Sequence, residues 1–169
     1  MNTEQQKETN RIIVCGVLGI ITMVYLALIG CVNVQHFNYK MNSDIGAEAV
    51  LARLIWNSGE MVPSTWISST ETRIIATPQL AALFYGWTGD MNLGLGLACC
   101  VMTTGILLAI WCFMKKAGFR TESCLLMCVL SLALSGNMTI LELLYLFASY
   151  YGIHVITFFF IMNVNFLYF

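Results

Sequence analysis

A long run without a charged side chain, from Ile12 to Val34, constrains this chain more than any other feature. At a rise of about 1.5 Å per residue, a helix over the run is about 34 Å long, which exceeds the hydrocarbon core of a bilayer at roughly 30 Å. Lys7 and Arg11 precede the run, in the way that basic residues precede the hydrophobic core of a signal peptide. However, the run is longer than a signal-peptide core, and "VNVQHFNYK" is a poor cleavage site. We therefore predict an uncleaved membrane-spanning helix over residues 12–34.

The composition points to the same class of protein. Only 10% of the residues are charged and 59% are hydrophobic, whereas about 25% of the residues of an ordinary soluble domain are charged. A soluble chain this short would expose large apolar patches. No basic stripe accompanies the net charge of −1, so we expect no nucleic-acid partner. The seven cysteines lie within or at the ends of apolar runs, and we predict that they pack as small hydrophobic residues rather than bind metal.

Two further uncharged runs follow, over residues 91–114 and 123–141. The first begins after Asp90 and carries small residues four apart, which allow close helix approach in lipid; they form the pairs Gly94 with Ala98 and Gly96 with Cys100. Residues 142–169 stay apolar and aromatic, so we predict an interfacial segment and the start of a fourth span there. Because the sequence stops at "FFFIMNVNFLYF", without a polar tail, we expect the front part of a longer protein.

The distribution of basic residues predicts the orientation. One cluster precedes the first run and another follows the second run: Lys7 and Arg11, then Lys115, Lys116 and Arg120. Two crossings put both clusters on one side of the membrane, which the positive-inside rule makes cytoplasmic. We therefore predict an all-α integral protein of the plasma (inner) membrane with about four transmembrane helices and a large external first loop containing short amphipathic helices. Its predicted parts are a cytoplasmic tail (1–11), three spans (12–34, 91–114 and 123–141), the external loop (35–90), a cytoplasmic loop (115–122) and the segment 142–169.

Within the external loop, "SDIGAEAVLARLIW" predicts an amphipathic helix that Ser43 or Asp44 caps. We expect this helix to lie along the bilayer surface, with an apolar face made of Ala47, Val50, Leu51, Leu54 and Ile55. Asp44 and Glu48 are one turn apart, so their carboxylates face the same way. This pair is either a capped, solvated first turn or a pair that binds a cation or acts as a base and its orienting group.

The second half of the loop carries a polar string after Pro63, interrupted by Trp66 as an anchoring aromatic residue. Glu71 and Arg73 follow, as a solvated loop pair or as residues that face a substrate. Next, "TPQLAALFYGW" predicts a short interfacial helix with Thr77 as N-cap and a proline at its first position.

The order of a first span, an external loop that opens with an aspartate, an amphipathic helix and a second span resembles the start of the membrane-embedded C-type glycosyltransferases. This superfamily includes the protein mannosyltransferase-like and aminoarabinose transferase-like families. Residues 43–80 are similar to its first external loop, in which an Asp, a helix, a Trp and an "STE-R" string precede a helix back into the membrane. Asp44 stands between Ser43 and Ile45, without the second adjacent acid that many members have.

The resemblance implies transfer of a sugar from a polyprenyl-phosphate donor to an external acceptor in the cell envelope. It assigns Asp44 and Glu71 as catalytic acids and places Arg73 near the donor phosphate; Glu48 and Trp66 are our further substrate-binding candidates. A carboxylate can deprotonate an acceptor hydroxyl, and a guanidinium can hold a phosphate. A divalent cation stays open as a cofactor, and the donor lipid and membrane lipids are the expected partners. The alternative function is that of a small non-enzymatic membrane protein or a transporter fragment.

Overall fold

The computed structural model describes residues 3–35, 43–67, 75–133 and 148–165, and every regular element in these ranges is a helix. The helices are α1 (Thr3–Gln35), α2 (Ser43–Ser58), α3 (Thr77–Thr88), α4 (Met91–Lys116), α5 (Thr121–Ala133) and α7 (Ala148–Asn165). The all-helical fold that the sequence predicts is thereby confirmed for the described residues.

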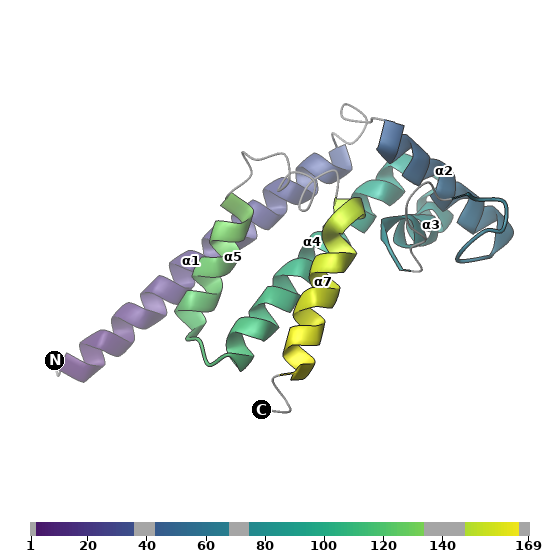
Figure 1. The fold of residues 1–169 in the computed structure, drawn as a ribbon. Helices are drawn as coiled ribbons and strands as arrows, with labels where there is room; N and C mark the ends of the chain where they lie inside the picture. Colours follow the sequence, from purple (N-terminus) through teal and green to yellow (C-terminus); the bar gives the residue numbers. More distant parts are fainter. Residues whose placement is uncertain (1–2, 36–42, 68–74, 134–147, 166–169) are drawn as a thin grey trace.

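Four of these helices, α1, α4, α5 and α7, form a bundle (Figure 1). Helix α1 packs against α4 and α5, and α4 also packs against α7. The start of α1 and the end of α7 lie at one end of the molecule, whereas α2 and α3 lie at the opposite end (Figure 1). Because α3 packs on both α2 and the first part of α4, these two short helices form a separate layer, which we call the α2–α3 cap.

Among the described residues, two helices are long and apolar enough to cross a membrane, α1 and α4. They contain the runs 12–34 and 91–114, and α1 begins at Thr3, within the segment 1–11 that the sequence predicts as a tail. Helix α5 has 13 described residues, which at a rise of about 1.5 Å per residue reach about 20 Å. The rest of the predicted span 123–141 lies outside the described residues. Helix α7 runs from Ala148 to Asn165, inside the segment 142–169 in which the sequence predicts an interfacial segment and the start of a fourth span.

Glycines of α4 allow two neighbouring helices to approach its backbone. A Cβ atom on Gly96 would lie 2.3 Å from the carbonyl oxygen of Asn33 in α1, and one on Gly94 would lie 3.0 Å from the carbonyl oxygen of Ala81 in α3. The small residues predicted to permit close helix approach therefore serve contacts within this chain. Asn33 itself is fully buried at the contact.

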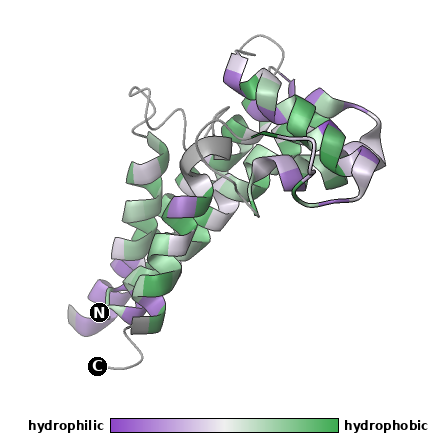
Figure 2. Ribbon diagram, turned by 45° about the vertical axis from the view of Figure 1, so that its right-hand side comes forward, coloured by the Kyte–Doolittle hydropathy of each residue, from purple (hydrophilic) through white to green (hydrophobic). Residues whose placement is uncertain are grey.

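The outer surface of the bundle is unusually apolar. Helix α1 exposes most of its large side chains, and α4, α5 and α7 add others; the exposed residues include Ile12, Ile20, Met23, Leu28, Leu108, Leu130, Phe158 and Phe160. Hydrophilic residues gather at the end of the bundle that carries the N-terminus and again in the α2–α3 cap, with a hydrophobic middle between them (Figure 2). The middle of the bundle is therefore apolar on its outer surface as well as in its core.

The hydrophilic end of the bundle carries the basic clusters. Arg11 of α1 donates a hydrogen bond to the carboxylate of Glu122 at the start of α5. The ammonium group of Lys116 donates to the carbonyl oxygen of Asn163 in α7 at 2.8 Å. The first contact joins α1 to α5, and the second joins α4 to α7. Because α4 ends at Lys116 and α5 begins at Thr121, these contacts lie at the same end of the bundle.

Candidate functional site

The α2–α3 cap contains all the described residues that the sequence singles out for function. Helix α2 begins at Ser43 and ends at Ser58, in agreement with the predicted amphipathic helix. The next residue, Gly59, has a left-handed backbone conformation with φ 71°. Its amide donates to the carbonyl oxygen of Ile55 at 2.9 Å. The predicted stop after the helix is confirmed, and a residue with a side chain would be strained at this position.

The predicted apolar face of α2 is wrong in part. The buried residues are Ile45, Glu48, Ala52 and Ile55, and three of them join Ala81, Ala82 and Leu95 in one core cluster. By contrast, Ala47 and Val50 are exposed. Small or apolar residues of α2 occupy most of its circumference, so their helical spacing did not determine which face would be buried. The contact with α3 determined that face.

The two acids of α2 lie in different environments, although they are one turn apart. Asp44 is exposed in the first turn, where a negative charge is favoured by the helix dipole. Glu48 is only 7% exposed and belongs to the buried face. The prediction of a solvated first turn therefore fits Asp44 but does not fit Glu48. Of the two carboxylates, Asp44 is the one that a molecule outside the cap can reach.

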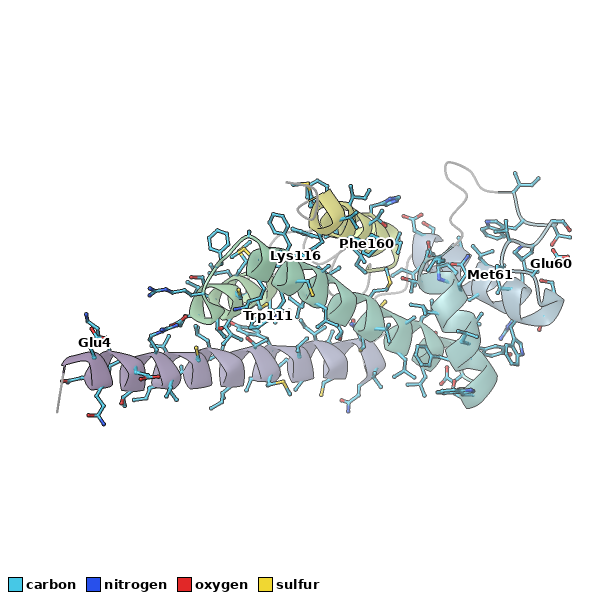
Figure 3. The ribbon with its side chains drawn as sticks, turned by 90° about the horizontal axis from the view of Figure 1, so that it is seen from below. Glu4, Glu60, Met61, Trp111, Lys116 and Phe160 are labelled. Atoms are coloured by element: carbon cyan, nitrogen blue, oxygen red, sulfur yellow. The ribbon has the colours of Figure 1, made fainter. Side chains whose placement is uncertain are left out.

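The loop after α2 is tied to the start of α3 by one side chain. The side-chain amide of Gln79 donates to the carbonyl oxygen of Met61 at 3.2 Å, and its oxygen accepts from the amide of Ala76 at 2.9 Å. The N-cap is therefore Ala76, and the prediction of Thr77 is wrong by one residue; the Gln79 side chain, at the third helical position, accepts from the backbone amide of the N-cap residue, as the glutamine of a capping box does. A glutamine three positions after the cap is the sequence signal for this arrangement. Figure 3 shows Met61 at the end of the molecule far from Glu4.

Trp66 lies in the same loop and is half-buried. Its amide donates to the carbonyl oxygen of Pro63 at 3.0 Å, and Pro63 is itself buried. The carboxylate of Glu60 accepts from the amide of Ser64 at 3.1 Å. The loop therefore has its own hydrogen bonds, and Trp66 has the partly covered position that an anchoring aromatic residue requires.

The turn from α3 into α4 contains a capping residue that sequence reasoning did not single out. Gly89 adopts φ 69°, and the carboxylate of Asp90 then accepts from the amides of Asn92 at 2.8 Å and Leu93 at 3.3 Å. An acid directly before a long apolar run is the signal that could have identified this N-cap. Through this turn, α3 is placed against the first part of α4.

Glu71 and Arg73 lie outside the described residues, so their assigned roles stay predictions. Within the ranges that the structure describes, no three His, Cys, Asp or Glu side chains come together in a way that could hold a metal ion. A divalent cation, if the protein uses one, thus has no ligand set in these ranges. The cysteines of the described ranges are unbridged; Cys99, Cys124 and Cys128 are buried, whereas Cys31 and Cys112 are exposed.

Among the described residues, two ion pairs lie at the basic end, opposite to the cap: Lys7 with Glu4 inside α1, and Arg11 with Glu122 between α1 and α5. The hydrogen bond from Arg11 lowers the pKa of the Glu122 carboxyl below its ordinary value, and the same contact raises the pKa of Arg11. Both groups are therefore held in their charged forms, and they link α1, at the residue before its uncharged run, to the first turn of α5.

Comparison of the chain with protein-family models, with curated proteins and with solved structures gives no match. The fold itself defines the class: a helical protein in which two helices have the length and hydrophobicity of membrane spans.

Proposed function

We propose that this chain is an integral membrane protein whose bundle of α1, α4, α5 and α7 lies in the bilayer, with the α2–α3 cap at the external boundary. The observation that carries the proposal is the apolar outer surface of the bundle. Large hydrophobic side chains that face outward, such as Ile12, Ile20 and Met23 on α1, would be costly in water at about 25 cal/mol per Å² of apolar surface, and they suit a lipid environment.

The charges support an orientation as well. Arg11, Lys115, Lys116 and Arg120 belong to the end of the bundle where α1 begins and α4 ends, and basic residues are enriched on the cytoplasmic side of membrane proteins. The N-terminus is then cytoplasmic, and the cap is external. With α5 and α7 as partners of α1 and α4, the proposal includes about four crossings.

Residue-specific labelling tests this arrangement. Gln6 and Ser64 are both exposed, one at each end, and each is changed to cysteine in a background in which the native cysteines are replaced. A membrane-impermeant maleimide added to sealed, right-side-out vesicles should label Ser64→Cys and should label Gln6→Cys only after the vesicles are opened. The reverse pattern would overturn the orientation, and removal of the protein from membranes by alkaline carbonate would overturn membrane insertion.

For the chemistry, we propose that the cap contributes to sugar transfer from a polyprenyl-phosphate donor and that the chain is the N-terminal part of such a transferase. The support is the resemblance of residues 43–80 together with the exposure of Asp44. A general base must reach the acceptor hydroxyl, which an exposed carboxylate in the first turn of α2 can do. Glu48, being buried, is better suited to shaping the cap than to touching an acceptor.

The test uses two isosteric substitutions in the full-length protein, assayed with a radiolabelled polyprenyl-phosphate sugar in isolated membranes. Asp44→Asn should reduce transfer by about 10²-fold or more, as expected for loss of a general base. Glu60→Gln is the matched control, because Glu60 is an exposed acid of the same cap and glutamine keeps its acceptor oxygen. Full transfer by Asp44→Asn at an unchanged membrane level would exclude Asp44 from the mechanism and leave the cap with a non-enzymatic role.

A further inference from the structure

Three large apolar side chains form one surface on the α2–α3 cap. Leu83 and Trp87 are one turn apart on α3, and Gly86 lies on the same helix face between them. The ring of Trp56 from α2 covers that glycine so closely that a Cβ atom on Gly86 would lie 2.2 Å from it. Trp56, Leu83 and Trp87 are therefore neighbours on one face, which we call the tryptophan patch.

The tryptophan patch faces away from the core of the cap. Trp56 is 48% exposed, Leu83 62% and Trp87 84%, whereas Ala81 and Ala82 of the same helix are buried in the cluster with α2 and α4. The helix thus buries small residues while it leaves two large apolar side chains, Leu83 and Trp87, exposed, whereas a water-facing helix turns such side chains inward.

The composition of the patch fits the boundary between lipid headgroups and acyl chains. Indole rings have an apolar body and one N–H donor, and tryptophan is enriched at this depth of the bilayer. Beside the patch, the guanidinium of Arg53 lies 5.6 Å from the centre of the Tyr85 ring. An arginine next to aromatic rings can reach a lipid phosphate while its stem stays on the apolar surface.

The position of the patch along the chain gives its depth. Trp87 precedes Asp90, the N-cap of α4, by three residues, and α4 is one of the two helices that could span a membrane. The patch therefore lies about one helical turn from the point where the uncharged run of α4 begins.

We propose that the tryptophan patch seats the α2–α3 cap in the headgroup–acyl boundary of the external leaflet, so that α3 lies in the lipid surface. This inference rests on the proposed membrane location of the bundle. Its consequence for function is that Asp44 and the rest of the cap are held at the level of a lipid-anchored substrate.

Quenching of tryptophan fluorescence by brominated phosphatidylcholine tests the proposal. The full chain with Trp56, Trp66 and Trp111 changed to phenylalanine reports on Trp87 alone. It is reconstituted into vesicles whose lipids carry bromine either near the headgroup end of the acyl chain or near its methyl end. We expect the shallow bromine to quench Trp87 about two-fold more than the deep one, because indole rings sit at the interface.

Two results would overturn the proposal: no quenching by either lipid, or stronger quenching by the deep bromine. If the patch instead joins two copies of the chain, quenching will be weak at a high ratio of protein to lipid and will rise on dilution with lipid, which also counts against it. Retention in carbonate-washed vesicles is measured in parallel. A retained but unquenched protein refutes only the patch, whereas an unretained protein refutes the membrane location as well.

Discussion

Substitution of Gly96 tests the contact between the two longest helices. An alanine Cβ at this position would lie 2.3 Å from the carbonyl oxygen of Asn33, 3.0 Å from its carbonyl carbon and 3.3 Å from the Cα atom of Val34. All three atoms belong to the backbone of α1, so no side-chain rotation can relieve the overlap. Ordinary contact begins at 3.4 Å, so α1 has to move away from α4 by about 1 Å, an overpacking of the kind that costs about 1–3 kcal/mol.

Alanine also has a favourable effect, because it is a better helix former than glycine by about 0.5–1 kcal/mol. The net loss for Gly96→Ala is then at most about 2.5 kcal/mol, which in a chain of this size lowers the apparent melting temperature by up to about 10 °C. The control is Gly19→Ala in α1, where a Cβ atom would meet nothing within 4 Å. This variant has the same change in propensity without the overlap, so it should melt at or above the wild-type temperature.

The assay follows the reaction of a thiol-specific fluorescent dye during heating in detergent. Cys99, Cys124 and Cys128 are buried and should react as the bundle opens. The reasoning would be refuted if Gly96→Ala melted at the same temperature as Gly19→Ala, since that result would mean that α1 and α4 do not approach at this glycine.

Three further predictions use the same melting assay. Gln79→Ala removes the side-chain bonds to Met61 and Ala76 and should lower the melting temperature by about 2–8 °C, whereas Gln79→Glu, which keeps only the acceptor for the Ala76 amide, should fall between; equal effects of the two would show that the bond to Ala76 contributes nothing. Asp90→Ala should cost about 1 kcal/mol through loss of the α4 N-cap, and Asp90→Asn should restore most of it; an Asn variant as unstable as the Ala variant would contradict capping. Because the pKa of Glu122 is lowered beside Arg11, the stability from this pair is present above the ordinary carboxyl pKa and is lost as the pH falls through the lowered value. The wild type should therefore lose more melting temperature than Glu122→Gln between about pH 6 and pH 3, and parallel pH profiles would contradict this.

Much of the fold could be predicted because the signals are local. Helices α1 and α4 follow from uncharged runs that are too long for anything but a helix through an apolar medium. The bounds of α2 follow from a serine and an acid at its start and from Gly59 at its end. In the candidate site, the exposure of Asp44 could be expected from its place in the first turn.

Other features could not be predicted, because they depend on which helix lies against which. The amino-acid sequence by itself determined which segments form the long helices and where the basic clusters stand relative to the uncharged runs, since hydrophobicity, caps and charge act over one or two turns. Only the tertiary structure decided that Glu48 is buried, that Gly96 receives the backbone of α1, and that Trp56 joins Trp87 on one surface. These outcomes come from contacts between residues far apart in the chain, and the pattern within a single helix carries no information about the shape of its neighbour.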